Sequence, residues 1–476
     1  MRNSGVTRPV LGATIAGWLM GGLGGPAMAE EAIPPAVQRR LEELELKVRT
    51  LERQQEVSEE VRTADKAKQT ATVSAGADGF ALKSTDGAFQ LTLRGLLHAD
   101  TRWFFDSDNP TGDDTFTLRR VRPYIEGTVF NIFDFKFMPD FAGGKTVIQD
   151  AYVDARFLPW LQIKGGKFKT PFGIERLQSA SAIRFVERAL PNNLVPNRDI
   201  GGELHGELGG GVFSYSLAGL NGVNDGRSSD DIGDIDNNVD KDFAGRIFAH
   251  PFLNTSIVPL QGLGIGFGAS YVDAGGSPDA PNLPNYRTSG QQRFFAYRGT
   301  TFSNGERLRL SPQGYYYYGP FGLLWEYVNV AQDVARDIDG VARTDELDHD
   351  AWQVAFSYVL TGEESTYRGV TPNRPFSFQS GTYGAFELKA RYSELSLDED
   401  TFAGGDDSFA DPTTAGEEAR AFAVGLNWYL NQNVKLVLDY EQTMFDGGGG
   451  GTADAPKDLE DEKSFSVGCI STFNPA

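Results

Sequence analysis

The chain lacks the features that mark helical membrane proteins and most metal-dependent enzymes. It has one cysteine, Cys469, and four histidines in 476 residues, so a disulfide framework within the chain is excluded. The histidines show none of the spacings at which metal ligands recur. After residue 30, no stretch of about 20 apolar residues could cross a bilayer as a helix. We expect no metal, no cofactor and no nucleic-acid partner.

Motifs for catalysis are also missing. No combination of Ser, His and Asp indicates nucleophilic catalysis. Gly143-Gly144-Lys145-Thr146 imitates the end of a phosphate-binding loop, but Pro139 stands where that loop needs a glycine. We therefore interpret this string as a turn between two strands. The chain is not expected to be an enzyme.

The first 29 residues have the pattern of a secretory signal peptide. Arg2 and Arg8 provide positive charge before an apolar, glycine-rich stretch at residues 10–23. Ala27-Met28-Ala29 is a small-x-small cleavage site. Removal of the peptide takes both arginines away and changes the net charge from −21 to −23. The mature chain is therefore expected outside the cytoplasm.

A short amphipathic helix is predicted next. Its apolar residues recur at alternating steps of four and three, and they are Val37, Leu41, Leu44, Val48 and Leu51. Charged residues flank them, which is typical of a coiled-coil seam of about two heptads. A helix this short is marginal in water. Two interpretations stay open, namely a coiled coil that joins copies of the chain and a transient helix on a tether. We assign residues 30–62 to this helix and residues 63–84 to a polar linker.

From Phe89 the sequence alternates with a period of two. Phe89, Leu91 and Leu93 share one parity, whereas Arg94 and His98 share the other. An apolar face towards lipid and a polar face towards a lumen is the pattern of a transmembrane β-barrel strand. The negative mean hydropathy agrees with this interpretation, because only every second residue of such a strand faces lipid.

The alternating pattern recurs along the rest of the chain. Aromatic residues expected at the membrane interfaces are Tyr315–Tyr318, Phe321, Trp325, Trp428-Tyr429 and Phe445. Short turns are expected at Asn131-Ile132, Gly319-Pro320 and Asn431-Gln432-Asn433. Longer acidic loops are expected at 106–114, 224–241, 398–418 and 446–462. Short turns on one rim and long loops on the other are typical of outer-membrane barrels.

These patterns predict an all-β fold, a transmembrane antiparallel barrel of about 16 strands over residues 85–473. Pro475 would interrupt a final strand, so either the last strand stops at Phe473 with a short tail or the terminus is not the native one. A soluble β-sandwich is the alternative, but it would have shorter strands and would hide its apolar face against a second sheet.

Five strings resemble the phosphate-selective porin O and P family and follow its order from about 85 to 445. They are Phe116–Arg122, Ile163–Gly173, Glu187–Leu190, Tyr358–Glu363 and Gly425–Tyr429. The resemblance implies a homotrimer of 16-stranded barrels in the bacterial outer membrane, surrounded by lipid. It also implies a loop at about 170–200 that folds into the barrel, and a ladder of arginines that leads to a lysine-lined constriction.

The resemblance supplies the candidate residues of an anion path. The arginine candidates are Arg94, Arg119, Arg120, Arg246 and Arg287, and the lysine candidates are Lys164, Lys167 and Lys169. A planar guanidinium group binds two phosphate oxygens at once, and a fixed positive charge lowers the cost of bringing an anion into a narrow lumen. Strand alternation cannot place all three lysines in the lumen. The alternative is that these cations pair with carboxylates such as Glu126, Asp150 and Asp154.

Together these observations predict a passive outer-membrane porin for small anions, with phosphate as the narrower expectation. The N-terminal helix is expected in the periplasm. Three alternatives stay open, namely a general or sugar-type porin, a cell-envelope tether that works through the helix and, more remotely, an outer-membrane barrel enzyme. The acidic loops do not contradict an anion pore, because the local potential of the lumen sets selectivity.

Overall fold

The computed structural model describes residues 34–68, 71–76, 79–105, 113–234, 241–453 and 455–472. The expected signal peptide and Phe473 lie outside these residues. The chain forms two units, residues 1–69 and residues 70–476, and each is described by itself.

The first unit contains one long helix, α1 (Pro35–Lys68). It continues beyond residue 62, so the expected boundary between helix and linker lies six residues too early. The seam residues Leu44 and Leu51 are exposed on the single chain, at 54% and 63%. The polar residues that follow the seam are good helix formers, which lets the helix continue without apolar contacts. Within the described residues, no helix is long and apolar enough to cross a membrane.

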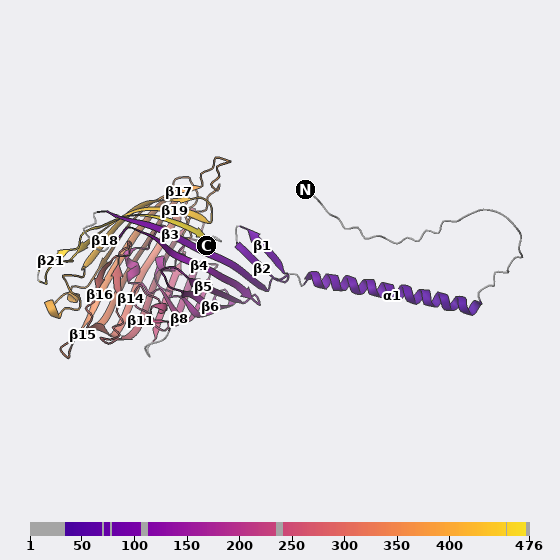
Figure 1. Ribbon diagram of the computed structural model, residues 1–476, viewed down its shortest axis with the longest axis horizontal. Helices are drawn as coiled ribbons and strands as arrows, with labels where there is room; N and C mark the ends of the chain where they lie inside the picture. The colour runs from indigo at the N-terminus through magenta and orange to yellow at the C-terminus, as the bar shows by residue number, and fades with distance from the viewer. Residues whose placement is uncertain are drawn as a thin grey trace. The chain divides into compact units, whose positions relative to one another are not determined.

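The second unit is a closed antiparallel barrel of sixteen strands within the described residues (Figure 1). The strands are β3 (Phe89–Phe105), β4 (Thr115–Val129), β5 (Phe133–Asp140), β6 (Val147–Leu158), β7 (Leu161–Lys169), β8 (Arg198–Leu208), β9 (Phe213–Leu220), β10 (Asp242–Ala249), β11 (Leu263–Gly275), β14 (Thr301–Tyr318), β15 (Phe321–Ile338), β16 (Val341–Val359), β17 (Ala385–Ser396), β18 (Glu418–Tyr429), β19 (Val434–Asp446) and β22 (Glu462–Thr472). Pairing of β22 with β3 closes the barrel, so the wall has no open edge.

Smaller elements decorate the barrel. Three hairpin pairs are formed by β1 (Thr72–Gly76) with β2 (Gly79–Lys83), β12 (Asn285–Arg287) with β13 (Arg293–Ala296), and β20 (Gly448–Thr452) with β21 (Ala455–Asp458). The short helices are α2 (Ile174–Leu177), η1 (Leu190–Asn193), η2 (Ser229–Ile232), η3 (Val258–Leu260), η4 (Glu399–Thr401) and η5 (Gly405–Asp407). Strand β2 pairs with the start of β3, so part of the expected linker is ordered sheet.

The predicted alternation of faces holds along the strands, but it corrects the list of interface aromatics. Tyr318 is exposed on the outer wall, as expected. Tyr315, Tyr317, Tyr429 and Phe445 have the parity of the lumen face, and they contact buried side chains inside the barrel. These aromatic residues were expected at the membrane interfaces because they lie near strand ends. Nearness to a strand end does not show which face of the strand a side chain takes.

The two rims of the barrel differ, as expected, but with exceptions: residues 250–262 are a long connection on the rim that mostly carries short turns, and residues 339–340 are a two-residue turn on the opposite rim. Short connections at residues 130–132, 319–320 and 430–433 lie on the rim where β3 begins, which we name the turn rim. The opposite rim, the loop rim, carries the long acidic loops. The connection between β16 and β17, residues 360–384, is long but lies on the turn rim. We name it the turn-rim loop, and part of it enters the lumen, as described below.

An apolar core fills one part of the lumen. Phe172, Leu190 and Leu194 from the connection between β7 and β8 pack with Phe294 and Phe295 of strand β13. Small lumen-facing residues of the wall complete the core, namely Ala351, Ala419 and Ala421. The strand number sets the diameter of the barrel, and these packed side chains narrow its lumen further.

We expect Phe172→Ala to lower the free energy of unfolding by about 3–5 kcal/mol, because it leaves a cavity among fully buried neighbours. Denaturant titration of the protein in detergent or lipid measures this change. Phe378→Ala is the matched control, since Phe378 is 91% exposed and its removal should cost less than about 0.5 kcal/mol. Equal losses in both variants would contradict the packing role of Phe172.

Candidate functional site

Residues 170–197 leave the barrel wall after β7 and return to it at β8. We name them the folded loop. Their partners lie on β17, which is eight strands from β7 in either direction around the barrel. Lys389 Nζ donates to Arg184 O at 2.5 Å, and Arg391 Nη1 donates to Glu187 O at 3.0 Å. The loop therefore crosses the whole lumen.

Charged side chains of the wall satisfy the polar backbone of the folded loop. Ile174 N donates to Glu326 Oε1 on β15 at 2.7 Å, and Val186 N donates to Asp439 Oδ2 on β19 at 2.7 Å. Buried peptide groups without partners would be costly. These bonds let an irregular segment lie at membrane depth inside the barrel.

Arg184 fastens the folded loop to the wall. Its Nε donates to Glu387 Oε1 at 2.9 Å, and Nη2 donates to Ser365 Oγ at 2.8 Å. Ser365 belongs to the turn-rim loop. In the same loop, Tyr367 accepts a bond from Gln178 Nε2 through its carbonyl oxygen at 2.6 Å. The turn-rim loop thus contacts the folded loop from the side of the turn rim.

Glu187 fastens the folded loop to another part of the wall, strands β3 and β4. Its buried carboxylate accepts bonds from Arg119, from Arg120 Nη2 at 3.4 Å and from Arg102 Nη2 at 3.0 Å. Burial opposes ionisation of this carboxyl, but the guanidinium groups of Arg119, Arg120 and Arg102 outweigh it and hold the pKa of Glu187 well below its ordinary value. Glu187 is therefore charged over the physiological range.

A β-bulge allows two consecutive arginines to reach one carboxylate. His98 pairs with Arg120, but its neighbour Ala99 pairs with Leu118, so Arg119 is an extra residue in β4. In regular strands successive side chains point to opposite faces. The bulge breaks that alternation and turns both Arg119 and Arg120 towards the lumen.

A cavity of about 670 Å³ lies between the folded loop and the wall formed by β4 to β8. Ten cationic side chains line it, and they are Arg119, Arg120, Arg122, Lys145, Lys169, Arg176, Arg188, Arg198, Arg227 and Arg287. Five carboxylates line it, and they are Asp140, Glu187, Asp225, Asp230 and Asp231. We name it the cationic cavity. Its lining is strongly positive although the chain carries a net charge of −21.

Half of these cations have no carboxylate partner among the residues that the structure describes. They are Lys145, Lys169, Arg176, Arg188 and Arg287. Lys169 Nζ donates to the carbonyl oxygens of Leu177 and Gln178, at 3.1 and 2.9 Å. Arg188 Nε donates to Glu175 O at 3.0 Å. Carbonyl oxygens orient these cations without cancelling their charge.

Arg176 illustrates the electrostatics of this set. Its Nη2 donates to Asn192 O at 2.6 Å, while its buried Nε has no partner in the described part of the chain. Burial and the guanidinium groups of Arg188 and Arg198 lower the pKa of Arg176 to about 9. The side chain is still charged at neutral pH, and a bound anion would relieve the repulsion among the three cations.

The structure brings together four of the eight predicted site residues. Arg119, Arg120, Arg287 and Lys169 line the cationic cavity. The other four lie elsewhere, each with its own partner. They are Arg94 with Glu126, Arg246 with Gln313, Lys164 with Glu203, and Lys167 with Asp230 and Asp234.

Several cations of the site escaped the sequence prediction. Arg122 shares the parity of Arg120, and Arg188 lies in a string that the family resemblance identified, so both carried a usable signal. Lys145 belongs to the predicted turn between β5 and β6, which the structure contains. Its place in the lining depends on the orientation of that turn relative to the lumen. Arg176 lies in the loop that the resemblance expected to fold into the barrel, so it also carried a signal, whereas Arg227 gave none.

A closed sixteen-stranded barrel, apolar outside and crossed by a loop inside, defines a porin of the outer membrane. The chain belongs to the phosphate-selective porin O and P family, whose model matches residues 89–446.

Three known proteins are similar to this chain. Porin O of Pseudomonas aeruginosa is 24% identical over 404 residues, which cover 77% of this chain and 86% of that protein. The outer-membrane channel DcaP of Acinetobacter baumannii has a similar fold, with a TM-score of 0.50 and 13% identity, covering 83% of this chain and 99% of DcaP. An anion-selective porin from Comamonas acidovorans aligns with a TM-score of 0.47 and 10% identity, over 81% of this chain and 99% of that one.

We expect Glu187→Gln to loosen the folded loop, because three guanidinium groups lose the carboxylate that they share, and only Arg102 keeps another, Asp100. The free energy of unfolding should fall by about 3–5 kcal/mol, and the open-channel current should fluctuate more. Single-channel recording in planar bilayers measures the second effect. Glu203→Gln is the control, since Glu203 pairs with Lys164 outside the cationic cavity. A quiet Glu187→Gln channel would contradict the anchoring role.

Proposed function

We propose that this porin is selective for anions and that the cationic cavity is the selective part of its passage. One observation carries the proposal. Ten cationic and five acidic side chains line the cavity, and five of the cations have no carboxylate partner in the described residues. The alternative, a general or sugar-type porin, predicts cations balanced by carboxylates, and such balance is found at Lys389 with Asp439 and at Arg391 with Glu441.

The chemistry of the cavity suits passage rather than tight binding. An anion that enters a narrow lumen loses part of its hydration, and a fixed positive charge replaces the lost interaction. The unpaired cations lie on several elements, from the turn at Lys145 to the folded loop at Arg176 and Arg188. Several weak sites in series let an ion move on, because each step exchanges one set of contacts for another.

Phosphate is the narrower proposal. Guanidinium groups bind two phosphate oxygens at once, and eight of the ten cations that line the cavity are arginines. The family description supports the same choice. Arg287 is the one cation of the hairpin β12–β13 that lines the cavity within the described residues. Selectivity for phosphate over chloride would therefore depend on Arg119, Arg176, Arg188 and their neighbours.

Reversal potentials test the proposal. In planar bilayers with a KCl gradient, we expect the sign of the reversal potential to show that chloride is more permeant than potassium. Replacement of chloride by phosphate should then reduce the small-ion current, because phosphate dwells longer at the guanidinium groups. Cation preference would overturn the proposal, and equal permeability of both ions would favour the general porin.

We expect Arg188→Gln to lower the permeability ratio of chloride to potassium by about twofold, since it removes one unpaired charge from the lining. Arg94→Gln is the matched control, because Arg94 pairs with Glu126 at 2.8 Å and does not line the cavity. The same reversal-potential measurement applies to both variants. A larger change in Arg94→Gln would place the selective region elsewhere in the lumen.

We also propose a homotrimer with helix α1 as a coiled coil in the periplasm. The exposed seam of α1 supports it, because such a seam is buried when copies of the helix associate. The alternative, a helix that only tethers the barrel, does not need the seam.

We therefore expect Leu44→Glu to lower the melting temperature of the oligomer in detergent, because a charge in the seam opposes association of the helices. Native electrophoresis of heated samples measures this temperature. Leu46→Glu is the control, because Leu46 lies off the seam and is 71% exposed. Identical melting of the two variants and the unmodified protein would remove this role of α1.

A further inference from the structure

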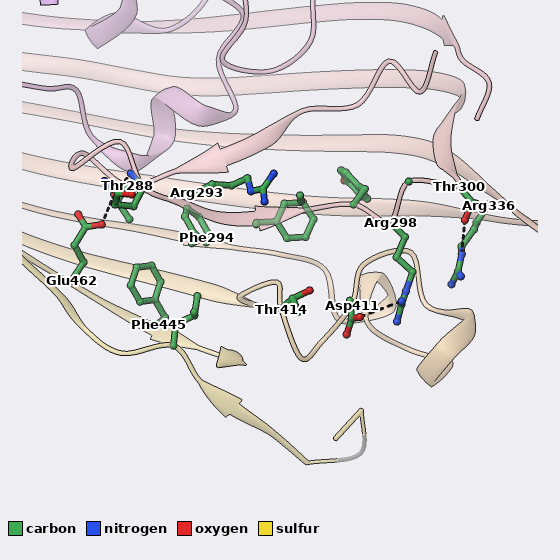
Figure 2. Close-up of a pocket in the computed structure, with 16 residues that line it drawn as sticks. Thr288, Arg293, Phe294, Arg298, Thr300, Arg336, Asp411, Thr414, Phe445 and Glu462 are labelled. Atoms are coloured by element: carbon green, nitrogen blue, oxygen red, sulfur yellow. Dashed lines mark hydrogen bonds and ion pairs between the residues drawn. The ribbon is translucent and has the colours of Figure 1, made fainter. Parts of the chain in front are cut away.

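A second cavity, of about 710 Å³, opens on the loop rim. It lies between strand β13 with the residues that follow it and the loops that precede β18 and β22, and Figure 2 shows its lining. We name it the rim pocket. It shares one lining residue, Thr288, with the cationic cavity, so the two spaces adjoin there but otherwise have different linings.

One part of the rim pocket is apolar and firmly held. Phe294 and Phe445 face each other with ring centroids 5.7 Å apart, and both belong to the apolar core of the barrel. Tyr297 is fixed by a hydrogen bond of 2.7 Å between its hydroxyl group and His349 Nε2. Leu459 packs on the same core from the last loop. Phe294 and Phe445 are 3% and 6% exposed, so they hold this wall of the pocket in place, and the partly buried Tyr297 and Leu459 add more accessible apolar surface.

Three arginines border this apolar surface. Arg298 Nη1 pairs with Asp411 Oδ2 at 3.3 Å, and Arg336 Nη1 donates to the carbonyl oxygens of Asp406 and Ser408 at 2.6 and 2.5 Å. Arg293 is exposed and has no hydrogen bond or ion pair to any described residue. Figure 2 shows Arg293 beside Phe294, and Arg298 and Arg336 near Thr300. Asp411 and Glu462 also line the pocket, so three cationic and two acidic side chains adjoin the apolar surface, and Arg293 and Arg336 are the arginines among them without a carboxylate partner in the described residues.

This combination discriminates among ligands. A small inorganic anion would use the arginines but leave the apolar surface wet. A neutral apolar molecule would use the surface but take water from the arginines without compensation. An anion that carries an aromatic ring satisfies both, since the ring packs on Phe294, Phe445 and Leu459 while the charged group meets Arg293. The volume lies within the range of sites for small organic molecules, about 300–1,000 Å³.

We propose that the rim pocket binds aromatic anions, in which a phosphate or carboxylate group is attached to a ring, at the entrance of the channel. The proposal goes beyond anion selectivity and does not depend on it, because the pocket and the cationic cavity have different linings. Such a site would hold aromatic anions at the mouth and let inorganic anions pass to the cationic cavity.

Calorimetric titration of the purified full-length protein in detergent tests the proposal with three probes. Phenyl phosphate carries both the ring and the charge, inorganic phosphate carries the charge alone, and benzyl alcohol carries the ring alone. We expect phenyl phosphate to bind roughly tenfold more tightly than either of the other two, since burial of a ring adds to the ionic contact. Equal affinities of phenyl phosphate and inorganic phosphate would overturn the proposal, as would an absence of binding.

Variants locate the site. Arg293→Gln alters an exposed side chain and should weaken phenyl phosphate binding about tenfold, and Leu459→Asn should weaken it severalfold while leaving the weak binding of inorganic phosphate unchanged. Arg188→Gln is the control, because it lies in the cationic cavity. The proposal would be overturned if Arg188→Gln lost phenyl phosphate binding while Arg293→Gln kept it. Anion selectivity is read separately from reversal potentials, so either proposal can fail while the other stands.

Discussion

The architecture of the lumen depends on the charge of one buried carboxylate. Glu187 lies in the folded loop and is held by Arg102, Arg119 and Arg120. A buried charge is costly unless it is paired and hydrogen-bonded, and here three guanidinium groups supply both. The contact fixes the loop against β3 and β4, while Arg184 fixes it against β17. The space between the loop and the wall from β4 to β8 keeps its shape because both contacts exist.

The lumen is divided into a filled part and an open part. In the filled part, apolar side chains of the folded loop and of β13 cover small wall residues, and cations pair with carboxylates, as Lys389 does with Asp439. In the open part, cations such as Lys169 and Arg188 are held by backbone carbonyl oxygens. The partner of a lumen cation, rather than its presence, thus separates a structural charge from one that an anion can use. The rim pocket adds an apolar surface that the open part lacks.

Much of the barrel could be predicted from the sequence, because a period of two follows directly from strand geometry and burial of one face. The three short turns and the inner or outer position of most strand residues follow from this rule. The rule fails where the backbone is irregular. The bulge at Arg119 places two neighbouring arginines on one face, and the turn-rim loop enters the lumen although most connections on its rim are short turns. The parity of Tyr429 and Phe445 was also missed, since closeness to a strand end does not say which face a side chain takes.

The sequence by itself determined that the chain forms an outer-membrane barrel of the phosphate-selective porin O and P family. That information is local, because alternation and short motifs are read within about 20 residues. Tertiary structure alone decided which cations share a cavity. Arg122, Arg176 and Arg227 come from a strand and two loops, and they meet in one lining only because the folded loop crosses the barrel. Ion pairing is equally non-local. Lys164 and Lys169, five residues apart, differ because a carboxylate of β8 reaches one and only carbonyl oxygens reach the other.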